Sequence, residues 1–257
     1  MTSPHKESNI NLIDLCPTIQ KNVNWQQVAD AGFRGAIIKA SQYSGTRIYA
    51  FEEYCKAAKR AGLVVGAYHF AYVGADPVKQ AQFFFQCAMA TGSQPGELPP
   101  VLDLEFAQPS VPGQAIVEWG EAFTAEVERL FYPDNRLLSP DDYRYRRCTV
   151  YIYPAFAQRL MPFLGNSTLV SRPLHIASYR SVKEPWKPSP GDKPLIPVGT
   201  WSDWTVWQYS GNNGYKVPGI AMDCDRNVFN GDYSAWDRFI GNEPKKHLPT
   251  SGPAEVM

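Results

Sequence analysis

Residues 100–105 read Pro-Val-Leu-Asp-Leu-Glu, an apolar run that ends in two carboxylic acids. Side chains alternate along a β-strand, so Asp103 and Glu105 lie on one face, about 6–7 Å apart along the strand. Leu104 then points away from them, into packing against helices. The run therefore predicts a buried strand with two acids at its C-terminal end.

Short apolar runs of the same kind recur along the chain, and in its first two thirds they are separated by helix-like stretches. Besides Val101–Leu104, the strands that we expect are Ile10–Leu15, Ala36–Lys39, Val64–Tyr68, Val150–Tyr153, His175–Ser178, Val206–Tyr209 and Met222–Asp225. The helices that we expect are Trp25–Ala31, Ala50–Ala61, Pro77–Thr91, Gln114–Phe131 and Ala155–Leu164. This order predicts an α/β fold, a parallel TIM-like barrel that is incomplete in its last third. The same alternation argues against a β-sandwich.

The domain organisation follows from where this alternation begins and ends. We expect one barrel domain over residues 9–240, preceded by a polar tail over residues 1–8. The polar stretch 241–257 contains Pro, Gly and Lys, and we expect it to be disordered. Two segments, 132–147 with its many charges and 181–200 with its prolines, are expected to be surface excursions.

Composition argues against several classes of function. The 25 basic and 25 acidic residues balance and form no basic stripe, so we do not expect a nucleic-acid partner. No run approaches the roughly 18 apolar residues of a membrane span, and residues 1–11 lack the apolar core of a signal peptide. We therefore expect a protein made in the cytoplasm, without membrane insertion. The five cysteines form no Cys-x-x-Cys pair and the four histidines lack metal-ligand spacing, so we expect free thiols, no metal and no cofactor.

Two more acids fall near the ends of predicted strands. Asp14 lies at the end of the first strand and Asp225 at the end of the last. Chemistry in a β/α barrel is located at the C-terminal ends of the strands. Because the first and last strands of a closed barrel are neighbours, Asp14 and Asp225 should approach each other and share one mouth with Asp103 and Glu105.

Such a set of acids suits the cleavage of glycosidic bonds. That reaction needs a carboxylic acid to protonate the leaving oxygen and a carboxylate to stabilise the oxocarbenium-like centre. Like charges that are held close together raise at least one pKa, which keeps a proton available near neutral pH. Ordinary structural roles compete with this hypothesis, since Asp14 suits a cap and Asp225 can pair with Arg226.

Other functions remain open on residue types. A nucleophilic cysteine assisted by His69 is one, because Cys16 and Cys224 lie near predicted strand ends, although Cys224 should face outward if Asp225 faces inward. A chitinase-type barrel is another, but it ends this strand with a longer Asp-x-x-Asp-x-Asp-x-Glu run, which is absent before Asp103. A non-catalytic barrel that only binds glycan is the third.

Nine short motifs follow one another across residues 9–240. They are Asn-Leu-Ile-Asp-Leu (11–15), Ala-Ile-Ile-Lys-Ala-Ser (36–41), Gly-Ala-Tyr-His-Phe (66–70), Pro-Val-Leu-Asp-Leu-Glu (100–105), Val-Tyr-Ile-Tyr (150–153), His-Ile-Ala-Ser-Tyr (175–179), Trp-Gln-Tyr-Ser (207–210), Val-Pro-Gly-Ile (217–220) and Asp-Arg-Asn-Val-Phe (225–229). In this order they resemble the glycoside hydrolase family 25 lysozymes, the Chalaropsis-type N-acetylmuramidases. The resemblance implies an irregular barrel, with five β/α units followed by three strands with few helices.

The resemblance also implies roles for individual residues. Glu105 matches the family's general acid and base, and Asp103 matches its partner carboxylate. Asp14 and Asp225 match further acids of the cleft. The residues that match motif positions near the sugar are Tyr68, Tyr151, Tyr179, Trp207 and Gln208, and alternation lets only one of the last two face inward.

The reaction that the resemblance implies is hydrolysis of the β-1,4 bond between N-acetylmuramic acid and N-acetylglucosamine, with net retention. Asp103 could attack the sugar directly or orient the substrate's own 2-acetamido group, and we favour the second path. We expect a monomer whose partner is bacterial peptidoglycan, acting on the wall after release or as part of a virion. The segment Leu15-Cys16-Pro17 and Gln42 depart from the family's usual residues, which changes contacts at the rim and leaves the four acids intact.

Overall fold

The computed structural model describes residues 10–89, 97–133, 147–180, 186–189, 191–211 and 216–242. Its strands are β1 (Asn11–Leu15), β2 (Phe33–Gln42), β3 (Thr46–Arg47), β4 (Val64–Phe70), β5 (Val101–Asp103), β6 (Thr149–Ile152), β7 (Leu174–Ala177), β8 (Val206–Ser210) and β9 (Asp225–Phe229). Eight of them close a barrel in the order β1-β9-β8-β7-β6-β5-β4-β2, because β2 pairs back onto β1. The two-residue strand β3 only adds a short hairpin to the end of β2.

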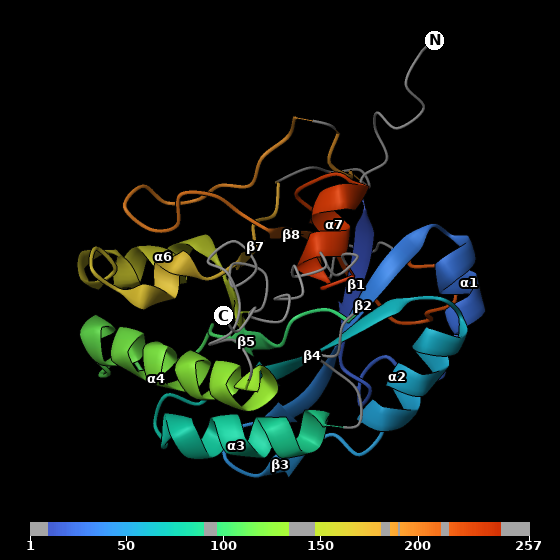
Figure 1. Ribbon diagram of the computed structural model, residues 1–257. Coiled ribbons are helices and arrows are strands. Elements are labelled where there is room, and N and C mark those ends of the chain that lie inside the picture. Colours follow the sequence, from blue (N-terminus) through green and yellow to red (C-terminus); the bar gives the residue numbers. More distant parts are fainter. Residues whose placement is uncertain are drawn as a thin grey trace, which may run out of the picture.

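Helices surround this barrel on the outside (Figure 1). They are α1 (Trp25–Asp30), α2 (Phe51–Arg60), α3 (Pro77–Ala88), α4 (Gly113–Phe131), α6 (Pro154–Leu160) and α7 (Tyr233–Phe239), with 3-10 turns η2 (Met161–Phe163) and η3 (Thr168–Ser171). The first five helices follow β1, β2, β4, β5 and β6 in turn, and β7, β8 and β9 come after them. The predicted irregular barrel of five β/α units and three further strands is therefore confirmed.

Local sequence explains where these helices begin. The carboxylate of Asp76 accepts the backbone N–H groups of Val78 and Lys79, at 2.8 and 3.0 Å, and so caps the first turn of α3. Pro77 fills the first helical position, where the missing N–H costs nothing. Asn24 caps α1 in the same way through the N–H of Gln27.

The last strand corrects the sequence prediction in both position and direction. We expected a parallel strand over Met222–Asp225, but β9 begins at Asp225 and runs antiparallel to both β8 and β1. Parallel neighbours need a long crossover, usually a helix, and the described residues between β8 and β9 contain none. The chain therefore turns back at the same end of the barrel, and Asp225 still lies at the mouth, opposite Asp14 in the register.

Several other expectations concern segments at the margins. The short helix α7 was not predicted, and α3 ends at Ala88, whereas the predicted end at Thr91 lies outside the described residues. The predicted tail 1–8, most of the excursion 132–147 and nearly all of the tail 241–257 also lie outside them. The described part of 181–200 contains neither helix nor strand, as expected of an excursion.

The barrel interior has an apolar floor beneath the acids. Residues two apart on a strand share a face, so Leu12 lies below Asp14 and Val101 lies below Asp103. Both apolar side chains are buried in one cluster with Ile37, Val206 and Phe229 of neighbouring strands and with Trp236 and Phe239 of α7. The rings of the two α7 residues lie 5.3 and 5.2 Å from that of Phe229. Helix α7 thus closes the end of the barrel opposite the mouth, and water is kept from the floor.

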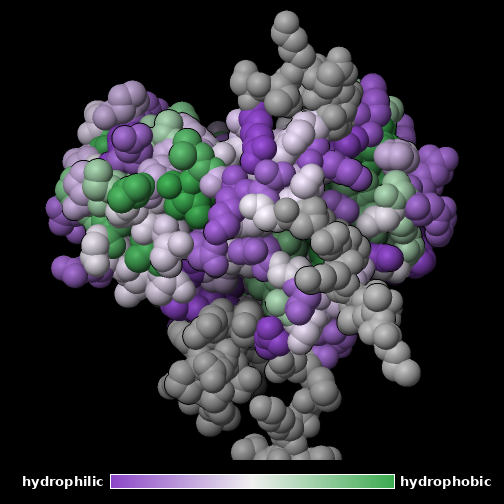
Figure 2. Space-filling view, turned by 90° about the horizontal axis from the view of Figure 1, so that it is seen from above, coloured by the Kyte–Doolittle hydropathy of each residue, from purple (hydrophilic) through white to green (hydrophobic). Residues whose placement is uncertain are grey.

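The outer surface is mixed in character. Seen from above, it is mostly hydrophilic through the middle, and hydrophobic side chains gather on the left, the side on which α6 lies in Figure 1 (Figure 2). Met161 and Phe163, in the turn after α6, are exposed apolar residues. Among the helices of the described residues, none combines the length and the apolarity that a membrane crossing requires.

Candidate active site

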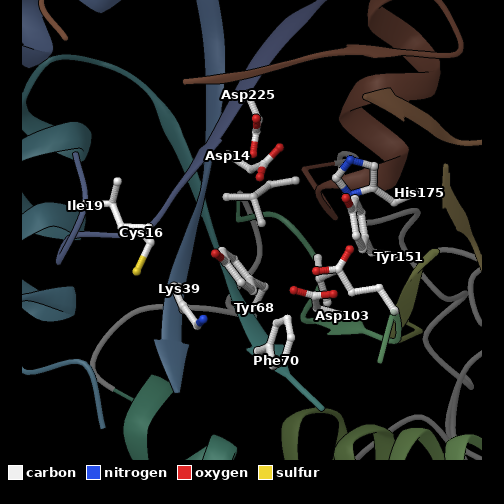
Figure 3. A pocket seen from close by; sticks show the side chains of 13 residues that line it. Asp14, Cys16, Ile19, Lys39, Tyr68, Phe70, Asp103, Tyr151, His175 and Asp225 are labelled. Atoms are coloured by element: carbon white, nitrogen blue, oxygen red, sulfur yellow. The ribbon is translucent and has the colours of Figure 1, made fainter. Parts of the chain in front are cut away.

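A cavity of about 180 Å³ opens at the mouth of the barrel. It is lined by Asp14, Asp103, Glu105 and Asp225, together with Cys16, Ile19, Ile37, Lys39, Tyr68, Phe70, Val101, Tyr151 and His175 (Figure 3). The structure therefore brings together all four acids that the sequence singled out. Tyr68 and Tyr151 line the same cavity.

Asp103 and Glu105 are held by the end of β5. The backbone carbonyl of Asp103 accepts the N–H of Ala71 at 3.0 Å, and the N–H of Leu104 donates to Tyr151 at 2.9 Å, so neighbouring strands fix this segment on both sides. Leu104 is fully buried and points toward α4, where it faces Gly120. The alternation predicted from the sequence thus aims both acids into the mouth.

Burial sets the proton affinity of this pair. Asp103 is only 8% exposed, and burial, reinforced by the charge of Glu105, holds its pKa well above the usual range. Burial also raises the pKa of Glu105, with Asp14 as the next cause, while the ammonium of Lys39 opposes the rise at both acids. A proton therefore stays on the pair to a higher pH than on isolated carboxyls. One oxygen of Asp103, Oδ1, is buried without a hydrogen-bond partner in the described part of the chain.

Asp14 and Asp225 form a second carboxyl pair across the β1–β9 junction. The two residues are register partners in the antiparallel ladder, and their carboxyl groups face each other in Figure 3. Burial, then the charge of Asp14 and a hydrogen bond to it, raise the pKa of Asp225 to about 9. At neutral pH Asp225 is therefore protonated and donates to Asp14.

Two amides orient Asp14. Gln208 and Asn227 each donate a side-chain N–H to the same oxygen, Oδ2, at 2.8 Å. The carbonyl oxygen of Gln208 in turn accepts the hydroxyl of Tyr151 at 3.0 Å and that of Tyr179, whose side chain is half exposed at the rim. Gln208 thus connects Asp14 by hydrogen bonds to Tyr151 and Tyr179, two of the tyrosines that the resemblance placed near the sugar.

Trp207 lies on the other face of β8. Its indole is buried against Trp186, Trp204 and Tyr209, and its N–H donates to the carbonyl of Ser178 at 2.7 Å. Alternation allows only one of Trp207 and Gln208 to face inward, and the structure selects Gln208. Trp207 therefore belongs to the outer packing layer and lies away from the cavity.

His175 is a polar neighbour that sequence reasoning did not include in the site. Because Asn227 donates to Asp14 through Nδ2, its Oδ1 faces His175, and Nε2 of the ring donates to it at 2.7 Å. Burial lowers the pKa of His175, so the ring is neutral at pH 7. Asn227 lies two residues after Asp225 on one strand, and this spacing is the signal that could have identified it.

The structure argues against a cysteine nucleophile. His69 is buried, bonds Ser41 at 2.8 Å and Gln80 at 3.2 Å, and stacks on Phe123. Burial lowers its pKa to about 4, so it is a neutral core residue at pH 7. Cys224 is directed to the backbone carbonyl of Asp14, and burial raises the pKa of its thiol well above the usual range. The five cysteines are free thiols, as predicted.

We expect Asp225→Asn to gain thermal stability over the parent protein as the pH rises from about 5 to about 8. The Asp225 carboxyl ionises near 3.8 when unfolded and near 9 when folded. Between these values the folded state binds more protons, so the stability of the parent falls as pH rises. Asparagine has no proton to lose and still donates an N–H to Asp14. Calorimetry should show a difference in Tm that grows with pH, by about 2–4 °C for each kcal/mol.

A matched control for this experiment is Asp30→Asn, which alters an exposed carboxylate on α1. Its Tm should follow that of the parent at each pH. A pH-independent difference for Asp225→Asn would contradict the protonated state assigned to Asp225.

Comparison with known proteins identifies the family. A profile of the glycosyl hydrolases family 25 matches residues 13–220, which include most of the barrel. This chain belongs to glycosyl hydrolase family 25. The predicted resemblance is therefore confirmed.

Two curated proteins are similar to this family 25 member. Lysozyme M1 of Streptomyces globisporus is 28% identical over 219 residues, which cover 82% of this chain and 65% of that protein. The chain thus spans about two thirds of the length of this relative. N,O-diacetylmuramidase of Arthroderma benhamiae is 23% identical over 225 residues, covering 86% of this chain and 82% of that protein.

Solved structures share the fold of this family 25 member. The bacterial lysozyme from Streptomyces coelicolor aligns with a TM-score of 0.73 at 24% identity, over 92% of this chain and 99% of that one. The family GH25 lysozyme from Aspergillus fumigatus aligns with a TM-score of 0.66 at 24% identity, over 91% and 99%. Both alignments extend over nearly the whole barrel.

Proposed function

We propose that this protein is a lysozyme that hydrolyses bacterial peptidoglycan at the β-1,4 bond between N-acetylmuramic acid and N-acetylglucosamine. The observation that carries the proposal is the convergence of four acids in one cavity, with Asp103 at the end of β5 and Glu105 two residues beyond it. Membership of family 25 and the similarity to a lysozyme and to an N,O-diacetylmuramidase support the same reaction. The proposed substrate is cell-wall glycan, reached after release of the protein or from a virion, and the protein acts as a monomer without a cofactor.

In this mechanism Glu105 carries the proton. Its raised pKa and its partial exposure suit a general acid that protonates the glycosidic oxygen as the bond to C1 breaks. Asp103 is more deeply buried, and its Oδ1 has an unused acceptor position. It accepts the N–H of the 2-acetamido group, whose carbonyl oxygen then attacks C1; direct attack by Asp103 is the alternative path. Glu105 next takes a proton from water, which attacks C1 and restores the original configuration.

The surrounding side chains would hold the sugar for this step. Tyr151 and Tyr179 both donate their hydroxyl protons to Gln208, so their oxygens are left to accept hydrogen bonds from the sugar. Burial holds the pKa of Tyr151 well above its usual range, which keeps that proton in place. Tyr68, on β4, lines the same cavity.

Mass analysis of the products tests the proposal. We expect digestion of defined bacterial cell walls, followed by borohydride reduction, to yield fragments that end in muramitol. Proton NMR during the reaction should show the β-anomer of the new reducing end first, as net retention requires. Fragments that end in glucosaminitol, or no fragments beyond those from heat-inactivated protein, would refute the proposal.

A further inference from the structure

Lys39 is a cation placed among the acids of the cavity. It follows the buried residues Ile37 and Ile38 on β2, and its ammonium group lies 4.7 Å from the ring centroid of Phe70 and 5.8 Å from that of Tyr68. In Figure 3 the side chain reaches the cavity from the side opposite Asp103. The two aromatic faces hold the charge in position through cation–π attraction.

In the part of the chain that the structure describes, the ammonium of Lys39 has no carboxylate partner at hydrogen-bonding distance. No described residue forms a salt bridge with it within the 4.0 Å that defines one, and none accepts a hydrogen bond from it, although four carboxyls line the same cavity. Within the described residues, it is also the one lysine or arginine that lines this cavity. A half-buried ammonium with three donors and no acceptor leaves room for an oxygen of a ligand.

We propose, resting on the function proposed above, that Lys39 is a specificity-determining residue that binds a carboxylate carried by the glycan. N-acetylmuramic acid differs from N-acetylglucosamine only by its 3-O-lactyl group, which ends in a free carboxylate wherever the stem peptide has been removed. Position 3 of the sugar is adjacent to the 2-acetamido group that Asp103 is proposed to hold. The carboxylate that we assign to Lys39 is therefore that of the lactyl group.

Electrostatic attraction to Lys39 would make the site select glycan with free carboxylates over neutral glycan. The acids of the cavity that are ionised repel an anionic ligand, and the ammonium of Lys39 offsets this repulsion beside Phe70 and Tyr68. The chain should therefore prefer strands with free lactyl carboxylates to neutral strands of the same shape. A neutral chitin oligosaccharide would gain nothing from the ammonium.

Activity alone cannot test this role. Lys39 also opposes the rise in pKa of Asp103 and Glu105, so its loss would change the rate on every substrate. The informative quantity is the ratio of two affinities, measured where no turnover occurs. We therefore place each Lys39 variant in the Glu105→Gln background.

The ligands are a tetrasaccharide of alternating N-acetylglucosamine and N-acetylmuramic acid with free carboxylates, and its methyl ester. By calorimetric titration, Glu105→Gln alone should bind the free acid about tenfold more tightly, as expected for a charged hydrogen bond. Adding Lys39→Met should abolish that preference, whereas Lys39→Arg should retain most of it. Lys79→Met, which alters an exposed lysine on α3, is the matched control and should leave the ratio unchanged.

Several results would overturn the inference. One is a preference that survives Lys39→Met; another is the absence of a preference in Glu105→Gln alone. A third ligand, with an L-Ala–D-Glu stem on each lactyl group, tests the other source of a carboxylate: if only this ligand responds to Lys39→Met, the lactyl assignment is wrong. Failure of the proposed function is distinguishable, because it would appear as missing muramitol ends with the parent protein.

Discussion

Replacing Glu105 by glutamine is expected to lower the rate of release of muramic-acid reducing ends by about 10²- to 10⁴-fold, the usual contribution of a general acid and base. Glutamine has nearly the same size, but its amide can neither protonate the glycosidic oxygen nor take a proton from water. The side chain is only partly buried and lines an open cavity, so the fold should tolerate the change. Initial rates on purified cell walls, with reducing ends counted after borohydride reduction, measure the effect.

The matched control is Glu118→Gln, which makes the same change of size and charge at another glutamate. Glu118 lies on the exposed face of α4, where it accepts a hydrogen bond from Gln114. Its rate should stay within about twofold of the parent, since isolated surface substitutions have small effects. A Glu105→Gln protein that kept more than about a tenth of the parent rate would remove Glu105 from the proton-transfer role.

The second large effect is on stability and involves a buried ion pair at the end of the barrel away from the mouth. Arg172, just before β7, donates to both carboxylate oxygens of Glu128 on α4, at 2.9 and 3.2 Å. The two side chains are only 3% and 7% exposed. The same carboxylate also accepts the backbone N–H of Cys148 at 3.1 Å, and the backbone carbonyl of Arg172 accepts the indole N–H of Trp201. The pair therefore joins α4 to the starts of β6 and β7.

Arg172→Met is expected to lower the free energy of unfolding by about 3 kcal/mol, because it leaves a buried carboxylate without its main partner. For a domain of this size that corresponds to a fall in Tm of about 6–12 °C. Arg147, 3.5 Å from Glu128, keeps the loss near the lower end of the range for such pairs. Calorimetry gives the Tm, and the rate on cell walls at 25 °C should be unchanged, since the pair lies far from the cavity.

Arg129→Met provides the control on the same helix. Arg129 pairs with Glu126 at 2.6 Å, but its side chain is 65% exposed, so its loss should lower the Tm far less than the loss of Arg172. Equal effects of the two substitutions would show that burial of the Glu128 pair adds nothing to stability. Glu128→Leu combined with Arg172→Met should recover part of the loss, because the carboxylate that Arg172 neutralised is then absent.

Much of the barrel could be predicted because, where short apolar runs alternate with helical stretches, each run can be assigned as a buried strand. The strands at Asn11–Leu15, Val64–Phe70 and Thr149–Ile152 lie within one or two residues of their predicted positions. The direction of β9 could not be predicted, because alternation along a strand is the same whichever way the strand runs. Only the length of the preceding link, and the lack of a helix in its described part, indicates the reversal.

The acids of the site were accessible from sequence because they directly follow apolar runs or stand within them. The residues that orient those acids were not. His175 is a buried polar residue whose role depends on pairing across strands, and nothing local marks it. For Asn227 the one local signal is its spacing of two residues from Asp225. Lys39 lies within a recognised motif, but its place among the acids depends on the closure of the barrel. Gln208 and Trp207 were left as alternatives, which only the register of β8 could separate.

The hydrogen bond between Asn227 and Asp14 joins positions 213 residues apart in the chain. Half of the acid pair and one of the two amides that orient it come from the final strand of the barrel. A nascent chain that ends after β8 therefore contains most of the barrel together with Asp103 and Glu105, but it lacks Asp225 and Asn227. Contacts of such long sequence separation form late because loop closure must precede them. We therefore expect the site to be complete only when β9 has paired with both β1 and β8.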